Sequence, residues 1–531
     1  MISTSGKLKY SKLRIGLACI LVQSISEKEF KSKNNFVNSN LTFMKKLIYT
    51  LAFVLILNLT FIIHNSAEAQ WQADVRLTND PALSMTGNNR SIASYGTVVH
   101  VVWQDSRVGN RFEIYYKRST DAGLSWGTDK CLTNNNVESS YSPSIAVSGS
   151  VVHVVWYDDR NWNDEIYYKR SSDEGVTWGA DTRLTNNDST SMSPSVAVSG
   201  SAIQVVWWDQ RDGNPEIYYK RSTDAGLSWG ADTRLTNNTA SSYLPSVAVS
   251  GSTVHVLWTD NRDGNYEIYY KRSTNEGLSW GADTRLTNND SVSENPSVAV
   301  SSSDVHIVWD DNRDGNYKIY YKHSTNEGLS WGADTRLTNS DSASYIPSVA
   351  VSSSAVHVVW WDHRDGIFET YYKLSTNAGL SWGTDTRLSN SISGSFSPSV
   401  AIAGSVVNVV WSDIRDGNDN EEIYYKRNPT GNPTGIIYVN SEIPSSYSLS
   451  QNYPNPFNPT TNVQFSMCNV QYVILQVYDI LGKEVATLVN EQLQPGSYEV
   501  NWNASQYSSG VYFYRLQTDG YTETKRMTLI K

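Results

Sequence analysis

Short runs of alternating apolar and polar residues repeat along most of the chain, and turn-forming residues bound each run. In one copy the runs span 246–250, 254–258, 267–272 and 280–286. Gly-Ser, Asp-Gly-Asn and a further glycine-containing segment separate them. Alternation over runs of this length is typical of β-strands, and Gly, Asn and Asp between runs are typical of hairpin turns. The pattern predicts a unit of four antiparallel strands.

The unit recurs at a fixed period. Its clearest marker reads Ser222-Thr-Asp224-Ala-Gly226-Leu-Ser228-Trp229 in one copy, and it or a near copy occurs six times in all. The spacing between copies is 52 residues once and 51 residues four times, measured between Trp126, Trp178, Trp229, Trp280, Trp331 and Trp382. A constant period of this size indicates a repeat architecture.

The two ends of the repeat region complement each other. Residues 71–79 match 229–237, so this region opens with only the last strand of a unit. Six complete units follow, and a seventh, at 397–427, stops before its fourth strand. We therefore predict an all-β fold, a seven-bladed β-propeller over 70–427, with residues 71–77 completing the last blade as its outer strand.

The eight-residue marker resembles the Asp-box, or bacterial neuraminidase repeat, which lies on a β-hairpin turn in sialidase-like propellers. An Asp or Asn oxygen at its third position can accept hydrogen bonds from backbone N–H groups two residues on, and the glycine can take positive φ. We predict that the third-position residues shape the turn and do not contact a ligand. These residues are Asp121, Asp173, Asp224, Asn275, Asn326 and Asn377.

The N-terminus has the pattern of a secretory signal. Two lysines after Met44 precede an apolar run at 47–63 and a small-residue site that ends at Ala69. We predict a signal peptide at 44–69 and a start at Met44, which makes 1–43 an extension outside the protein. An uncleaved membrane anchor is the alternative.

The composition changes after Arg427, where 428–446 is predicted to be a linker. The following segments then read Gln451-Asn-Tyr-Pro-Asn-Pro-Phe-Asn-Pro-Thr-Thr461 and Val477-Tyr-Asp-Ile-Leu-Gly-Lys-Glu-Val485. They resemble the C-terminal sorting domain of the type IX (Por) secretion system of Bacteroidetes and their relatives. The resemblance implies that 447–531 is a small C-terminal β-sandwich, that the type IX machinery is a partner, and that the protein is exported to the cell surface or the extracellular space.

Composition and charge limit the remaining partners. A net charge of −10 argues against a nucleic-acid ligand, whose phosphates call for a basic face. Three cysteines in different parts of the chain cannot form a disulfide framework, and no Cys/His cluster has zinc-ligand spacing. We predict a monomeric propeller with no cofactor and no metal site, and Ca²⁺ bound by Asp clusters is the alternative.

The hairpin between the second and third strands carries Asp-x-Arg in every unit. In a propeller this hairpin lies on the face opposite the Asp-box, the face usually used for ligands. The motif is either a turn with a local ion pair, or part of a ring that binds anionic sugars or Ca²⁺. The candidate binding residues are Asp105, Arg107, Asp158, Arg160, Asp209, Arg211, Asp260, Arg262, Asp311, Arg313, Asp362, Arg364, Asp413 and Arg415.

Two further repeated positions carry polar aromatic groups. Tyr-Tyr-Lys in the third strand, as at 218–220, is predicted to pack in the core and between blades. One position in the second strand holds histidine in five units and Gln204 or Asn408 in two, which favours a packed, hydrogen-bonded position over a metal ligand. The histidines are His100, His153, His255, His306 and His357.

The near identity of the units argues against a catalytic centre. Sialidases use an arginine trio, a Tyr nucleophile with a Glu partner, an acid/base Asp and an Arg-Ile-Pro sequence, and here the corresponding place reads Arg90-Ser-Ile92. A catalytic centre also needs unlike groups that converge, whereas these units are nearly interchangeable. We therefore predict a secreted propeller that binds a glycan or a protein, and a divergent sialidase-like glycoside hydrolase is the alternative.

Overall fold

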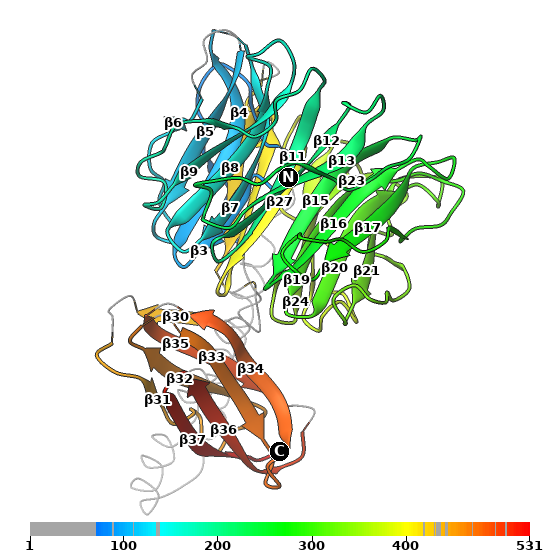
Figure 1. Cartoon of the computed structure of the whole chain (residues 1–531). Coiled ribbons are helices and arrows are strands. Elements are labelled where there is room, and N and C mark those ends of the chain that lie inside the picture. Colours follow the sequence, from blue (N-terminus) through cyan, green and yellow to red (C-terminus); the bar gives the residue numbers. More distant parts are fainter. Residues whose placement is uncertain are drawn as a thin grey trace, which may run out of the picture. The chain divides into compact units, whose positions relative to one another are not determined.

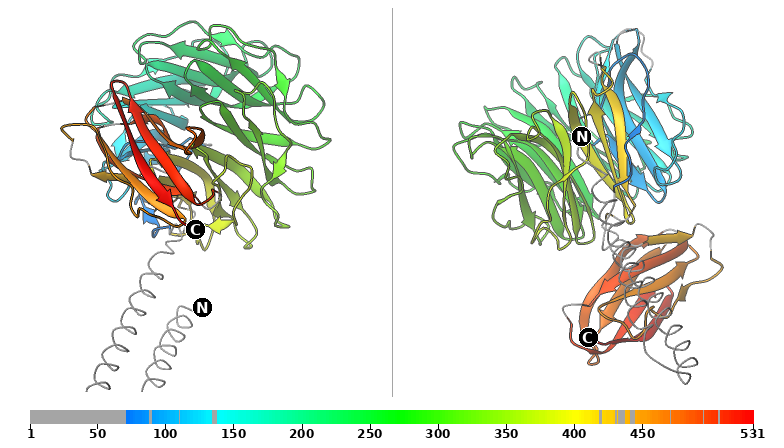
Figure 2. Two further views of the ribbon diagram at one scale, coloured as in Figure 1. Left: turned by 90° about the horizontal axis from the view of Figure 1, so that it is seen from below. Right: turned by 180° about the vertical axis from the view of Figure 1, so that it is seen from behind.

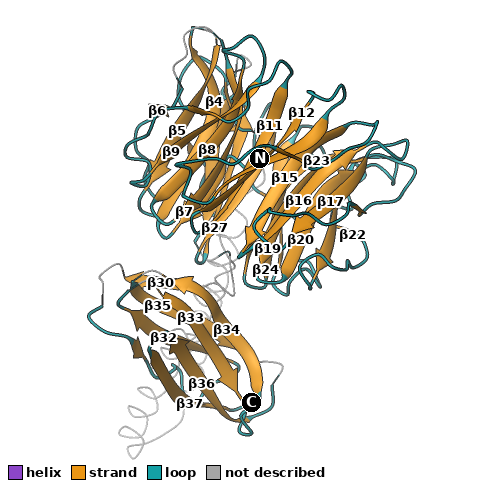
Figure 3. Cartoon of the chain, in the orientation of Figure 1, coloured by secondary structure: helices purple, strands orange, loops and turns teal. Residues whose placement is uncertain are grey.

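The computed structural model describes residues 71–531 apart from short gaps. The gaps are 88–89, 110, 134–137, 418–419, 430, 432–436, 441–443, 470, 494 and 505–506. The predicted extension at 1–43 and signal peptide at 44–69 lie outside the described residues. Across the described residues every regular element is a β-strand (Figure 3), and no helix there is long and apolar enough to cross a membrane.

One repeat unit shows how the sequence pattern becomes a sheet. Strands β15 (Ser242–Ser250), β16 (Thr253–Asp260), β17 (Glu267–Ser273) and β18 (Thr284–Arg285) pair antiparallel in chain order. Three strands agree with the predicted runs, and the fourth is much shorter than the predicted 280–286.

The fourth strand is short because Trp280 is used for packing and not for pairing. Its ring lies edge-on against Tyr219 of the preceding sheet, with ring centroids 4.9 Å apart. The next residue, Gly281, donates its N–H to the Arg272 carbonyl at 2.9 Å, which holds this segment beside β17 before the ladder begins.

The remaining sheets of the repeat region have the same plan (Figure 1). The first comprises β2 (Ser84–Met85), β3 (Ile92–Tyr95), β4 (Val98–Val108), β5 (Arg111–Ser119) and β6 (Lys130–Cys131). The second and third are β7 (Ser140–Ser148), β8 (Val151–Asp158), β9 (Glu165–Ser171) and β10 (Thr182–Arg183), then β11 (Ser191–Ser199), β12 (Ala202–Asp209), β13 (Glu216–Ser222) and β14 (Thr233–Arg234). The fifth and sixth are β19 (Ser293–Ser301), β20 (Asp304–Asp311), β21 (Lys318–Ser324) and β22 (Thr335–Arg336), then β23 (Ser344–Ser352), β24 (Ala355–Asp362), β25 (Glu369–Ser375) and β26 (Thr386–Arg387).

The seventh sheet joins the two ends of the repeat region. It contains β27 (Ser395–Ala403), β28 (Val406–Asp413) and β29 (Glu422–Asn428), and its outer strand is β1 (Val75–Arg76). This is the pairing predicted for residues 71–77. The innermost strands contact one another in the order β3, β7, β11, β15, β19, β23 and β27, and β27 returns to β3. The sheets therefore form a closed ring, seen from two further directions in Figure 2, and the all-β propeller prediction is confirmed.

The hydrophobic core of the propeller lies between neighbouring sheets. One buried cluster joins Val206 and Tyr219 of one sheet to Val256 and Trp258 of the next, and Trp258 has no exposed surface. Equivalent clusters occur at the other junctions. Because each sheet buries its faces against both neighbours, no single unit has a complete core of its own.

A close contact between sheets explains the Asp-box glycine. Gly277 has φ of +81°, and a Cβ built there would lie 1.9 Å from the Tyr219 hydroxyl oxygen of the preceding sheet. The same contact joins the last sheet to the first, where Tyr425 meets Gly123. The tyrosines of Tyr-Tyr-Lys thus pack in the core and between sheets, as predicted.

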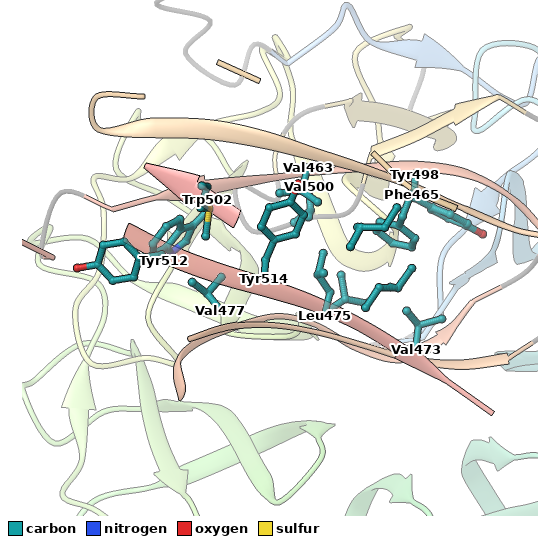
Figure 4. Packing of buried hydrophobic residues seen from close by; sticks show 14 of the residues in the cluster. Val463, Phe465, Val473, Leu475, Val477, Tyr498, Val500, Trp502, Tyr512 and Tyr514 are labelled. Carbon is teal, nitrogen blue, oxygen red and sulfur yellow. The ribbon is translucent and has the colours of Figure 1, made fainter. Parts of the chain in front are cut away.

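The C-terminal part is a separate β-sandwich. One sheet has the order β30 (Ile437–Asn440), β35 (Gly496–Asn503), β32 (Thr460–Met467) and β31 (Ser448–Leu449). The other has the order β34 (Glu484–Leu493), β33 (Gln471–Tyr478), β36 (Gly510–Thr518) and β37 (Tyr521–Leu529). Figure 4 shows the buried side chains between them, including Phe465, Trp502 and Tyr514. Strand β30 lies inside the stretch predicted as linker, because its Ile-Tyr-Val run pairs with β35, so the sandwich starts at Ile437 and not at Tyr447.

Candidate functional site

The Asp-x-Arg hairpin is held by a buried carboxylate. Asp209 closes β12 and has no exposed surface. Its two oxygens accept hydrogen bonds from Arg211 Nε at 2.8 Å and Arg211 Nη2 at 2.6 Å. The same carboxylate also accepts from Trp207 Nε1 at 3.0 Å and from Ser191 Oγ at 2.7 Å. The Arg211 N–H also donates to Asp209 Oδ1 at 3.0 Å, so each carboxylate oxygen accepts at least two hydrogen bonds.

A second carboxylate engages the same arginine. Asp232, which precedes the outer strand, accepts from Arg211 Nη1 at 2.8 Å and forms an ion pair with Lys220 Nζ at 2.9 Å. The Arg211 guanidinium lies 4.4 Å from the centroid of the Tyr218 ring, in a cation–π contact. The Asp-x-Arg pair is thus the centre of a network that ties three strands of one sheet together.

This network stabilises the charged forms of Asp209 and Arg211. Burial favours the neutral acid, but hydrogen bonds from Arg211 and Trp207 outweigh it and lower the pKa of Asp209 below its ordinary value. Burial also opposes the Arg211 charge, and bonds to Asp209 and Asp232 outweigh that burial and raise the pKa of Arg211. The same buried carboxylate with zero exposed surface occurs at Asp105, Asp158, Asp209, Asp260, Asp311, Asp362 and Asp413. This geometry is that of the local ion-pair alternative, and ligand contact by the pairs stays a prediction.

The Asp-box turn forms through donors other than those predicted. Asp224 Oδ1 accepts from the Leu227 and Ser228 N–H groups at 3.1 and 2.9 Å, three and four residues on. The N–H two residues on belongs to Gly226 and instead donates to Ser222 Oγ at 2.9 Å. Asn275 Oδ1 accepts the Ser279 N–H at 2.9 Å, so an amide oxygen replaces the carboxylate oxygen as expected.

The repeated histidine is a packed, hydrogen-bonded position, as predicted. His255 is 1% exposed, and its Nδ1 lies 2.8 Å from the Tyr270 hydroxyl. Gln204 takes the same place opposite Tyr219, and Asn408 Oδ1 accepts from Tyr425 at 2.7 Å. The tyrosine hydroxyl is therefore satisfied by three kinds of side chain.

Arg90 is a half-buried cation that lies at the central channel of the ring. Arg90 borders a cavity of about 40 Å³ and a second of about 290 Å³ that is walled mainly by Ala and Val of the inner strands. Its guanidinium donates to the Val298 carbonyl at 2.9 Å and the Val196 carbonyl at 3.3 Å. Burial lowers the pKa of Arg90 to about 10. Among the described residues, no carboxylate forms an ion pair with Arg90.

One group of acidic and amide side chains breaks the symmetry of the ring. Asp310 lies at the end of β20, where the other units have Gln104, Tyr157, Trp208, Thr259, Trp361 and Ser412. It is buried, and its oxygens accept from Asn295 Nδ2 at 3.2 and 3.1 Å and from the Ile346 N–H at 3.0 Å. Burial, with a smaller effect of the Glu294 charge, raises the pKa of Asp310 to about 8. Asn295 also borders the smaller Arg90 cavity, so these groups lie at the channel entrance.

Half-buried aromatic rings extend from this acidic group across three consecutive sheets. Tyr345 lies 5.1 Å from Tyr317 and 5.4 Å from Trp361, measured between ring centroids. Phe368 lies 4.5 Å from Trp361 and 5.8 Å from Phe396. We call these five residues the aromatic cluster. The repeated pattern does not predict these residues because they differ between units, and that difference is the signal for them in the sequence.

Comparison with known proteins identifies the C-terminal part. Residues 451–531 match the family model described as the secretion system C-terminal sorting domain. No curated protein matches the chain. Similar solved structures include the polysaccharide lyase Uly1, with 10% identity, a TM-score of 0.49, and coverage of 67% of this chain and 99% of that one. They also include a mutant of Trypanosoma rangeli sialidase displaying trans-sialidase activity, with 13% identity, a TM-score of 0.41, and coverage of 86% of this chain and 91% of that one. The phage phi92 endosialidase has 9% identity, a TM-score of 0.42, and coverage of 86% of this chain and 87% of that one.

The family match bears on the export of the protein and not on its activity. The sorting domain marks the chain as a secreted protein that interacts with the type IX secretion machinery. The similarities to solved structures concern the fold only, so any activity has to be inferred from the residues of this chain.

Proposed function

We propose that the exported propeller binds carbohydrate through the aromatic cluster, which lies at the ends of the sheets that carry the Asp-x-Arg hairpins. The observation that supports this is the asymmetry of the cluster, which brings five aromatic rings together beside Glu294, Asn295 and Asp310. Aromatic rings can pack against the apolar face of a sugar, while carboxyl and amide groups bond its hydroxyls. A secreted protein meets such ligands outside the cell.

The Asp-x-Arg pairs take a supporting part in this proposal. Trp361 immediately precedes Asp362, whose carboxylate is bound by Arg364 Nε at 2.9 Å and Nη2 at 2.7 Å. Because these bonds hold the hairpin in one conformation, the neighbouring ring is positioned before a ligand arrives. Preorganisation of this kind lowers the entropic cost of binding.

A glycan array with the purified full chain tests the proposal, followed by titration of the strongest hit. We expect Trp361→Ala and Phe368→Ala each to weaken binding by about tenfold or more, since aromatic anchors dominate such contacts. Trp208→Ala is the matched control, because Trp208 holds the same repeat position as Trp361 in another unit. Equal losses at Trp208 and Trp361, or no binding to any glycan, would contradict the proposal.

Glycoside hydrolysis is the second candidate, and one observation favours it. Asp310 and Glu294 are neighbouring carboxyl groups in unlike environments, and the pKa of Asp310, raised to about 8, keeps it protonated at neutral pH as a general acid must be. The Tyr317 hydroxyl bonds Glu294, and burial with that bond raises the pKa of Tyr317. A panel of fluorogenic glycosides, sialosides included, decides between the candidates. Turnover that Asp310→Asn abolishes while glycan binding survives would establish the hydrolase, and no turnover is expected from a binding protein.

A further inference from the structure

One repeat unit differs from the others at two equivalent positions. Position 304 begins β20, and its equivalents in the other units are Val98, Val151, Ala202, Thr253, Ala355 and Val406. Position 323 lies near the end of β21, and its equivalents are Arg118, Arg170, Arg221, Arg272, Leu374 and Arg427. Only this unit has Asp at the first position and His at the second, and both are residue types that bind metals.

The sheet brings these two residues together with the repeated histidine. His306 and His323 are directly opposite each other on β20 and β21, and their rings stack with centroids 4.5 Å apart. Asp304 lies two residues before His306, so it points to the same side of the sheet. Asp304 Oδ1 is 3.6 Å from His323 Nε2, and one ligand atom from each of the three residues lies within 4.8 Å of the others.

The imidazoles have nitrogen atoms available for a ligand. Nε2 of His306 and Nε2 of His323 are buried, and neither has a hydrogen-bond partner among the described residues. The 3.6 Å separation from Asp304 exceeds hydrogen-bond length. Nδ1 of His306 lies 2.8 Å from the Tyr321 hydroxyl, a bond that fixes the ring and can hold the proton on Nδ1, leaving the Nε2 lone pair available.

We propose that Asp304, His306 and His323 bind a divalent transition-metal ion, for which Zn²⁺ is the best match. Two imidazoles with one carboxylate form a ligand set that suits Zn²⁺ and neighbouring metals, and solvent can complete the coordination. The Asp304 side chain is 30% exposed, so an ion can first reach its carboxylate from solution, whereas both Nε2 atoms are buried. Asp304 and His323 both lie near strand ends, and their side chains would have to rotate to reach zinc–ligand distances of about 2.0–2.2 Å.

The site is independent of the carbohydrate proposal. Asp304 begins β20 and Asp310 lies near its other end, so the metal ligands and the acidic group of the aromatic cluster occupy opposite ends of one strand. His323 is followed by Ser324, which opens the Asp-box turn at Asn326. A bound ion would therefore link the start of β20 to the strand that leads into this turn.

Zinc titration of the untagged full chain, stripped of metal with EDTA, tests the proposal by calorimetry and thermal melting. We expect one Zn²⁺ per protein and a higher melting temperature. Asp304→Ala and His323→Arg each install a residue that other units carry at that position, so both variants should fold. Each should lower the affinity by about tenfold or more.

His255→Gln is the matched control, because Gln204 fills the same strand position in another unit, and this variant should bind Zn²⁺ like the parent protein. Failure of the parent to bind one equivalent would overturn the proposal. So would equal binding by the Asp304→Ala/His323→Arg double variant, or an equal loss of affinity in His255→Gln.

Discussion

Removal of residues 71–78 tests whether β1 closes the ring. This segment supplies the outer strand of the seventh sheet, and Leu77 is buried there with 4% exposure. Asp74 bridges Arg415 Nη1 and Lys426 Nζ, each at 2.7 Å. Without the segment, the backbone edge of β29 is left without a partner strand.

The cost can be worked from these contacts. Burial of Leu77 contributes roughly 2–3 kcal/mol. The two backbone bonds Gln72 N–H to Arg427 and Leu77 N–H to Ile423, at 2.9 and 2.7 Å, contribute about 1 kcal/mol each. The Asp74 ion pairs are partly exposed and contribute about 0–1 kcal/mol each. These contacts alone contribute about 5 kcal/mol, a large fraction of the stability of an ordinary domain, and the packing of Trp71 against Tyr372 adds to it.

Chemical denaturation and size-exclusion chromatography measure the outcome. We expect a lower unfolding midpoint and self-association through the β29 edge, since an unpaired edge recruits other strands. Leu235→Ala is the control for local damage, because Leu235 is the equivalent residue and is also 4% exposed. It should lower stability without opening the ring. An unchanged midpoint with a monomeric profile in the deletion variant would show that the ring closes without β1.

Three other changes have defined outcomes. Burial raises the pKa of Asp310 from 3.8 to about 8, so between these pH values the folded protein holds a proton that the unfolded chain releases. The free energy of unfolding should therefore fall by up to about 1.4 kcal/mol for each unit by which the pH rises from about 4 to 8. Asp310→Asn should remove this dependence in urea titrations at pH 5 and 8, and identical pH profiles for the two proteins would contradict the assignment. Gly277→Ala should cost about 2 kcal/mol or more because of its clash with Tyr219 and its positive φ, and Gly264→Ala, where φ is also positive but no atom lies within 4 Å, separates the clash from the backbone strain. Deletion of 437–531 should leave the propeller in the periplasm, as cell fractionation would reveal, and normal export of the truncated chain would refute the role of the sorting domain.

Much of the fold could be predicted because the repeat constrains it. The period, the turn residues and the odd strand at 71–77 determine how many strands pair and how the ends meet. The errors arise where a residue serves a neighbour in space and not in sequence. Trp280 packs on the preceding sheet and leaves the ladder, and Ile437 pairs with a strand that lies about 60 residues away.

The candidate site was harder to predict for a related reason. A repeat is recognised by what its copies share, and the shared Asp-x-Arg pairs are committed to holding each hairpin. The residues that differ between copies, such as Asp310 and Trp361, become one site only when neighbouring sheets pack side by side. Their proximity depends on the ring, which no single unit encodes.

The pairing of β1 with β29 also sets an order of events as the chain is made. Arg76 bonds Glu422 across a sequence separation of 346 residues. A chain that emerges from its N-terminus can stack six sheets in turn, but β1 has to wait for the seventh, with the apolar Leu77 exposed until then. The sandwich that directs secretion begins at Ile437, directly after β29 in the sequence. Any chain long enough to present its sorting domain therefore already contains both strands that close the ring.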